Sequence, residues 1–226
     1  MERKIIDIVP YDPNWPNFFE MQAKEIASVL GENVIQIHHI GSTSVPGLCA
    51  KPKIDIMCVV KDLKIVSKTL ESVGFKDRGE FRHLPLRLFF SKHGNPDINL
   101  HIVKENNGEI ERSLCFRDYL RKNEEARDLY GNTKLKLLKE NKDGFEMVQN
   151  QIFSNYANQK TSVIMKILKM TNYNGYRLIE ALEENEISAF KKLMNLEKIS
   201  FDNPDIFHLC LYKGIGLVAA VLIEFY

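Results

Sequence analysis

The feature that most constrains the fold is the run Ile54–Val60, Ile-Asp-Ile-Met-Cys-Val-Val, which is apolar at every position but one. A run of this length without polar alternation predicts a strand that is covered on both faces of its sheet. The exception is Asp55. A carboxylate inside such a strand costs free energy unless a metal ion or hydrogen-bond donors compensate for its burial. The run therefore predicts a central strand and also a candidate site on it.

The remaining patterns predict the rest of the sheet and the helices around it. Helices are expected from the turn at 11–16 to Leu30, over 63–73 and, beyond residue 111, over most of the chain to 170, with a long helical pattern at 145–170. Further strands are expected near 5–9, 34–40, 75–78, 86–91 and 98–103. This order predicts an α/β (α+β) fold, in which a mixed sheet carries flanking helices.

Residues 172–226 are expected to form a small all-α C-terminal unit that follows a domain over residues 1–170. Two tail segments, 178–194 and 207–223, align at an offset of about 29 residues and resemble degenerate ankyrin helix pairs, whose usual repeat is ~33 residues. Either these helices pack onto the core, or they belong to a longer repeat array. In the second case the tail could dock a protein partner.

Charge and composition limit the possible partners. The formal net charge is +1, so the chain has no global field that would favour nucleic acid or an anionic membrane, and any phosphate-binding surface must be local. No apolar stretch approaches the ~20 residues that span a bilayer. The four cysteines are scattered and form no Cys-x-x-Cys pair. We therefore expect a cytoplasmic protein with no membrane contact, and the charge argues against a nucleic-acid partner.

A small, hydroxyl-rich turn precedes Asp55 and could bind phosphate. Gly41 allows close backbone approach, and the hydroxyls of Ser42 and Thr43 can donate to phosphate oxygens. A phosphate cradle that faces a strand-borne carboxylate suits transfer from a nucleoside triphosphate with a divalent cation. Two simpler interpretations stay open: the turn could only connect two elements, and Asp55 could be a buried carboxylate paired with Lys51, Lys53 or an arginine.

Several separated motifs are similar to those of the GrpB family, which is placed in the nucleotidyltransferase superfamily. In chain order they are Tyr11–Pro16, Gly41–Ile56, Leu100–Val103, Phe116–Arg121 and Tyr130 with Lys134. The resemblance covers residues 5 to 165 and implies a nucleotidyltransferase-like mixed sheet. It implies that Asp55 is catalytic and binds a divalent cation, Mg²⁺ or Mn²⁺, and that His101 is a second metal ligand or a base.

The resemblance also implies a set of nucleotide-binding residues. They are Gly41, Ser42, Thr43, Arg117, Tyr130 and Lys134, and Arg87 joins them as a candidate because of its residue type and strand pattern. Arg87 lies on a predicted strand and could contact a phosphate through two hydrogen bonds. Arg117 could instead form an internal salt-bridge set with Asp118 and Arg121. Lys134 could instead belong to a solvated lysine face, which is the commoner case.

One position departs from the superfamily pattern. Typical members carry a second carboxylate two residues after the first, but here that position is Met57, which cannot bind a hard cation. The leading hypothesis is a nucleotidyltransferase that moves a nucleotidyl group from a nucleoside triphosphate to an unknown acceptor. The alternatives are a non-catalytic nucleotide-binding or chaperone-like module, for which Met57 argues, and a bacterial effector that docks a protein through residues 172–226.

Overall fold

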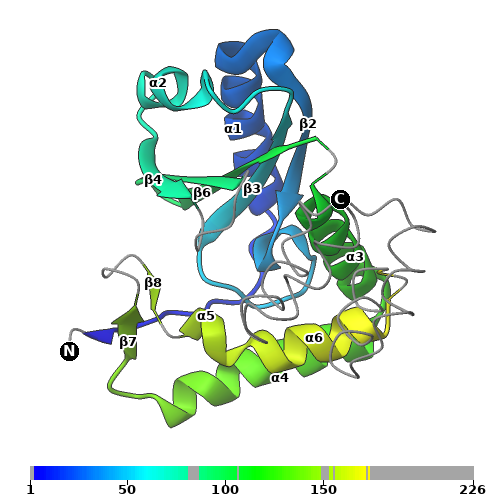
Figure 1. The fold of residues 1–226 in the computed structure, drawn as a ribbon. Coiled ribbons are helices and arrows are strands. Elements are labelled where there is room, and N and C mark those ends of the chain that lie inside the picture. Colours follow the sequence, from blue (N-terminus) through cyan, green and yellow to red (C-terminus); the bar gives the residue numbers. More distant parts are fainter. Residues whose placement is uncertain are drawn as a thin grey trace, which may run out of the picture.

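The structure is a computed structural model that describes residues 3–80, 87–105, 107–148, 153–154, 156–171 and 173. A mixed five-stranded sheet forms its centre, with helices on both faces (Figure 1). The strand order is β2 (Val34–Ile40), β3 (Lys53–Val60), β6 (Asp97–Lys104), β5 (Arg87–Lys92) and β4 (Lys76–Glu80). β3 and β6 run parallel, whereas the other neighbouring pairs are antiparallel. The mixed sheet with flanking helices expected from the sequence is confirmed.

Helices α1 (Trp15–Leu30) and α2 (Val66–Glu71) cover one face of this sheet. α1 begins at Trp15-Pro16, where proline suits the first turn, and ends at Gly31, whose φ is +53°. Trp15 is 2% exposed and packs in the main core with the residues of β3 that alternate onto this face. These are Ile54, Ile56, Cys58 and Val60.

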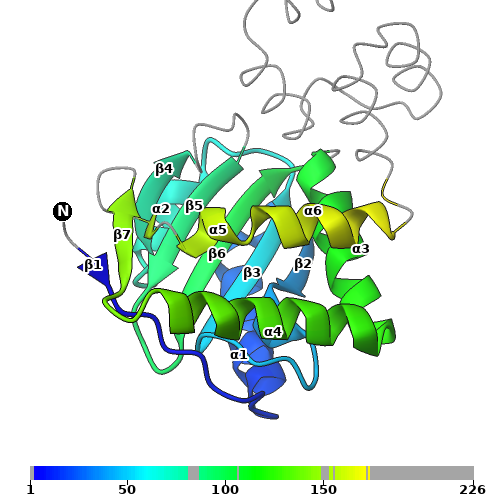
Figure 2. The same ribbon diagram turned by 90° about the horizontal axis from the view of Figure 1, so that it is seen from below.

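The other face of the sheet carries α3 (Gly108–Lys122), α4 (Glu124–Glu140), α5 (Tyr156–Gln159) and α6 (Thr161–Lys169). Figure 2 shows α4 and α6 side by side across this face. Met57 and Val59 of β3 are buried here against Ile110 and Leu114 of α3. Since β3 is buried on both faces, the prediction from its apolar run is confirmed.

A single asparagine makes the corner between α3 and α4. Asn123 ends α3, where its backbone N–H donates to the carbonyl of Tyr119 at 2.8 Å. Its side-chain oxygen accepts a hydrogen bond of 2.8 Å from the backbone N–H of Ala126, which caps α4. The corner therefore turns α4 back across the sheet and carries Tyr130 and Lys134 toward the start of β3.

The long helix expected over 145–170 is wrong in its first part. The chain instead forms β7 (Phe145–Val148), β8 (Phe153–Ser154), α5 and α6, and β7 pairs with β1 (Arg3–Lys4) in a small three-stranded sheet. Gly144, with φ +85°, interrupts helical geometry just before β7. A Cβ on Gly144 would lie 2.8 Å from the carbonyl oxygen of Lys4, so the N-terminal segment packs directly against this turn.

Two other expectations concern the ends of the chain. The strand expected near 5–9 is wrong: β1 ends at Lys4, and within 5–9 only Val9 forms a bridge, in which it exchanges two backbone hydrogen bonds of 2.9 Å with Ala50. The predicted C-terminal unit at 172–226 lies outside the described residues, apart from Tyr173. Within the described ranges, no helix has both the length and the apolar character needed to cross a membrane.

Candidate functional site

Asp55 lies where β2 ends and where β3 and β6 begin. In the sheet it is opposite Ile40 of β2 and Asn99 of β6. Its Oδ1 accepts a hydrogen bond of 2.7 Å from the Asn99 side-chain amide. Gly41 lies directly against the carboxylate, since a Cβ built there would be 2.9 Å from the Cβ of Asp55, and its φ is +71°. Glycine is therefore needed at residue 41 both for the backbone conformation and for the close approach.

The turn after Gly41 is held by its own hydroxyl groups. Ser44 Oγ donates to the Gly41 carbonyl at 2.6 Å, and Thr43 Oγ1 donates to the Lys53 carbonyl at 3.3 Å. Thr43 is 1% exposed and also contacts His39 Nε2 at 3.1 Å. Ser42 is half-buried. Thr43 and Ser44 thus stabilise the turn, and Ser42 is the hydroxyl of the three that is placed to meet a ligand.

Lys134 reaches this turn from α4. Its Nζ donates to Ser42 Oγ at 3.2 Å and to the backbone carbonyl of Cys49, and it lies 4.8 Å from the centroid of the Tyr130 ring. Lys134 is 2% exposed, and burial is the main cause that lowers its pKa to about 7. The structure therefore brings together the predicted residues Ser42, Tyr130 and Lys134. Lys134 does not lie on a solvated lysine face, whereas the side chain of Lys136 is 74% exposed.

Two more lysines lie at this end of the sheet: Lys51, expected only as a possible partner of Asp55, and Lys160, which the sequence prediction missed. Lys51 Nζ lies 4.2 Å and Lys160 Nζ 4.5 Å from the centroid of the Tyr156 ring. Burial, followed by the charges of Lys160 and Lys53, lowers the pKa of Lys51 to about 7. Burial raises the pKa of Asp55, while its hydrogen bond from Asn99 and the charges of Lys53, Lys160 and Lys51 act in the opposite direction.

The residues at this end of the sheet that were not predicted as site residues differ in how readily the sequence identifies them. Lys51 and Lys53 flank Pro52 just before Asp55, so their position in the longest motif could have identified them. Lys160 and Tyr156 lie in no motif. Asn99 can be identified as a site residue only when the register of β3 and β6 is known, because that register places it opposite Asp55.

His101 and Arg87 form a separate buried cluster on the same face of the sheet. Arg87 Nη1 pairs with Glu109 Oε2 at 3.0 Å, and Arg87 Nη2 lies 3.3 Å from His101 Nδ1. Burial acts to raise the pKa of Glu109, but Arg87 and Arg112 outweigh it and hold the pKa below its usual value. Arg87 therefore contacts both His101 and Glu109, and the His101 ring also packs on Phe89, with centroids 5.1 Å apart.

The sheet register decides which residue of β6 is beside Asp55. Asp55 is opposite Asn99, whereas His101 is opposite Met57. Residues two apart on a strand are about 7 Å apart, so Asn99, and not His101, is the direct neighbour of the carboxylate. The expected joint binding of a metal by Asp55 and His101 thus stays a prediction without a contact between the two side chains.

Arg117 fits the alternative of an internal ion-pair set. Its Nε donates to Asp118 Oδ1 at 2.7 Å, and its Nη1 donates to the backbone carbonyl of His39 at 3.1 Å. Arg121 Nε donates to the Ser44 carbonyl at 2.9 Å, and Arg121 Nη1 lies 3.7 Å from Asp118 Oδ1. These arginines tie α3 to the end of β2 and to the turn that follows it.

The donors near Asp55 limit how a metal could bind. They are the Asp55 carboxylate, the side-chain oxygen of Asn99 and, directly after Gly41, the Ser42 hydroxyl, and the charges of Lys53, Lys160 and Lys51 also act on Asp55. No group of three or more His, Cys, Asp or Glu residues within the described part of the chain is arranged to hold a metal ion. Mg²⁺ is usually bound by one or two carboxylates together with substrate phosphates. The site therefore fits a cation that arrives coordinated to phosphate, and not a tightly held free ion.

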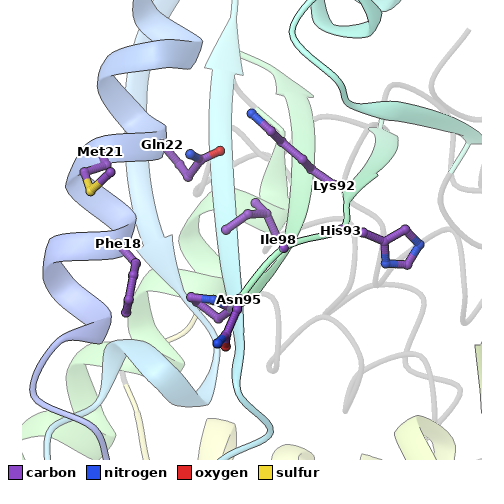
Figure 3. A pocket seen from close by; sticks show the side chains of 9 residues that line it. Phe18, Met21, Gln22, Lys92, His93, Asn95 and Ile98 are labelled. Carbon is purple, nitrogen blue, oxygen red and sulfur yellow. The ribbon is translucent and has the colours of Figure 1, made fainter.

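A hollow of about 210 Å³ lies on the opposite face of the sheet, between α1 and the turn from β5 to β6 (Figure 3). Phe18, Met21 and Gln22 line it from α1, and Lys92, His93 and Ile98 line it from β5, the turn after it and β6. Lys92 is engaged in an ion pair of 2.7 Å with Glu25. None of the residues predicted for the site around Asp55 lines this hollow, so it is separate from that site.

Comparison with known proteins gives a family match and several relatives. Residues 5–170 match the family model described as GrpB protein. A UPF0157 protein of Halalkalibacterium halodurans is 42% identical over 174 residues, which are 74% of this chain and 83% of the relative. The glutamate-rich protein GrpB of Alkalihalophilus pseudofirmus is 28% identical over 170 residues, 71% of this chain and 92% of the relative.

A solved structure also resembles the chain. The crystal structure of the conserved protein GrpB from Enterococcus faecalis superposes with a TM-score of 0.61 and 31% sequence identity. The superposition covers 73% of this chain and 98% of that one. The family match, residues 5–170, contains every residue that the sequence predicts for the site.

The contact between Gly41 and Asp55 predicts an unequal effect of two glycine substitutions. Gly79, with φ +77°, has nothing within 4 Å of an added Cβ, so Gly79→Ala should lower the free energy of unfolding by about 1 kcal/mol. Gly41→Ala adds a collision with the Asp55 side chain and should cost about 3 kcal/mol or more. Urea unfolding measures both. Equal costs would show that residue 41 does not pack on the carboxylate.

Burial of Lys134 predicts a stability that rises with pH. Its pKa is about 7 in the folded protein and about 10.4 in an unfolded chain, so between these values the unfolded state binds more protons. The free energy of unfolding should increase by about 1–2 kcal/mol from pH 7 to 8.5. Urea titrations of Lys134→Met should show a smaller rise, whereas Lys136→Met should keep the full one. A rise that is unchanged in Lys134→Met would contradict this assignment.

Proposed function

Because this chain belongs to the GrpB family, we propose that it binds a nucleoside triphosphate beside Asp55 and transfers a nucleotidyl group to an acceptor. The resemblance of its motifs to the nucleotidyltransferase superfamily suggests this chemistry. The observation that carries the proposal is the convergence of Ser42, Asp55 and Lys134 at one end of the sheet. Together they supply a hydroxyl donor, a carboxylate and an ammonium group beside a turn that Gly41 leaves exposed.

Ser42 and Lys134 are suited to bind one phosphate group. Their polar atoms are 3.2 Å apart, so both can donate to oxygens of the same phosphate. An ammonium group has three donors, and Lys134 uses two of them on Ser42 and on the Cys49 carbonyl. An anion bound here also favours the charged form of Lys134 and restores the pKa that burial has lowered.

Asp55 is suited to accept a proton from the acceptor. In the transfer, an acceptor oxygen forms a bond to the α-phosphorus, the bond from that phosphorus to the bridging oxygen breaks, and pyrophosphate leaves. The proton of the acceptor hydroxyl passes to Asp55 Oδ2, because Oδ1 already accepts from Asn99. A divalent cation that comes with the phosphates would be held by their oxygens beside Asp55 and would supply charge stabilisation there.

A second candidate is nucleotide binding without turnover. The sheet positions that flank Asp55 on this face are Met57 and Asn99, neither of which is a carboxylate. Superfamily members that catalyse transfer carry additional carboxylates, so the departure favours a module that binds nucleotide and does not transfer it. This candidate predicts the same ligand binding and no labelled product.

Substitution of Asp55 by asparagine separates the two candidates. Thermal shift with ATP, GTP, CTP and UTP, each with Mg²⁺ and with Mn²⁺, should reveal the bound nucleotide, and a labelled-nucleotide assay should reveal transfer. Asp55→Asn should reduce transfer by about 10²-fold or more. It should bind metal-free nucleotide as well as the wild type or better, because a negative charge is removed from beside Lys51, Lys53 and Lys160.

Asp128→Asn is the matched control for this experiment, because Asp128 is exposed on α4. It should retain both the thermal shift and the transfer. Full transfer by a well-folded Asp55→Asn variant would contradict the catalytic role of Asp55. A thermal shift without product in the wild type would establish the second candidate instead.

A further inference from the structure

Three lysines and two tyrosines form a continuous chain of contacts along the edge of the site. The Nζ of Lys134 lies 4.8 Å from the Tyr130 ring, and the Nζ of Lys160 lies 5.9 Å from the same ring. Lys160 also lies 4.5 Å from the Tyr156 ring, whose centroid is 4.2 Å from the Nζ of Lys51. Both rings are buried, with 4% and 2% exposure, so they fix the positions of the ammonium groups. The chain runs from the Ser42 turn to Lys51.

The two lysines on Tyr156 differ from other lysines of the protein in their counterions. Lys53, Lys92 and Lys136 each pair with a carboxylate, at 3.4, 2.7 and 3.7 Å. Within the described residues, neither Lys51 nor Lys160 has a carboxylate within ion-pair distance, although both are half-buried. Two such ammonium groups beside one ring repel each other, and a dianionic group between them would relieve that repulsion.

We propose that Lys51 and Lys160, seated on Tyr156, form a second phosphoryl subsite beside the Ser42–Lys134 subsite. It receives the terminal phosphates of the nucleoside triphosphate, so this inference rests on the proposed function. Cation–π contact with Tyr156 holds both ammonium groups in place before the ligand arrives. Lys51 lies two residues before β3, whose third residue is Asp55, so the subsite lies at the same end of the sheet as the carboxylate.

The subsite also has a place in the transfer step. When the α-phosphorus forms its bond to the acceptor, negative charge builds up on the departing pyrophosphate. Ammonium groups already fixed around that position stabilise the charge without reorganisation. Lys51 and Lys160 would thus stabilise the departing pyrophosphate, while Ser42 and Lys134 hold the α-phosphate of the nucleotidyl group that is transferred.

Isothermal titration with three ligands tests the subsite. Inorganic pyrophosphate, the nucleoside triphosphate and the matching nucleoside monophosphate are titrated into wild type, Lys51→Met, Lys160→Met and the double variant. Each substitution should raise the Kd for pyrophosphate and for the triphosphate by about tenfold. The Kd for the monophosphate should not change, because that ligand lacks terminal phosphates. Lys136→Met, on the exposed face of α4, should bind all three ligands like the wild type.

The outcomes separate the subsite from the proposed function. A pyrophosphate affinity that is the same in the double variant as in the wild type, or an equal loss for the monophosphate, would overturn the subsite. The latter loss would mean that the lysines hold a phosphate of another origin. Pyrophosphate binding that depends on the two lysines, with no binding of any nucleotide, would defeat the proposed function and leave the subsite standing. Because both substitutions relieve like-charge crowding, thermal unfolding should show that the variants remain folded.

Discussion

The electrostatic balance around the Asp55 carboxylate organises this end of the molecule. Burial disfavours its charge, and Asn99 together with the lysines around it offsets that cost. The lysines in turn are crowded, and burial and mutual repulsion make the ammonium form of Lys51 costly. The lysines therefore help to keep the carboxylate charged, whereas Asp55 offsets only a small part of what burial and the neighbouring lysines cost Lys51. Gly41 completes the arrangement, since a larger residue there would displace the carboxylate from beneath the turn.

The central sheet could be predicted because each of its strands can be recognised from its own local sequence. An apolar run such as Ile54–Val60 has few other structures available, and the glycines at 31 and 41 mark where neighbouring elements end. The region 145–170 could not be predicted in this way. Phe145 and Tyr156 fit a helical period by spacing, yet their rings pack against each other with centroids 5.0 Å apart. Gly144, just before β7, packs directly against Lys4, and spacing cannot show this contact between distant parts of the chain.

The parts of the site that could be predicted are those whose residues lie in the family motifs. Residue spacing alone did not predict which side chains meet. The motifs joined Ser42 to Lys134, and the structure places their polar atoms 3.2 Å apart. Spacing could not show that Arg87 faces the buried Glu109, because the pair depends on how α3 packs on β5. Nor could it choose between Asn99 and His101, since that choice requires the register of two parallel strands.

The origin of the site residues has a consequence for how ligand binding and folding are linked. The turn after β2, the start of β3, helix α4 and the segment around α5 each contribute at least one charged or hydroxyl group. The segment with Tyr156 and Lys160 follows β8 in the sequence. Its Tyr156 side chain packs against Phe145 and Ile6. A ligand that bridges the lysines would bind the fully packed state and not states in which this segment is undocked, and it would stabilise the former by mass action. Phosphate binding would thus strengthen the connection between the central sheet and the small sheet that holds the N-terminal residues.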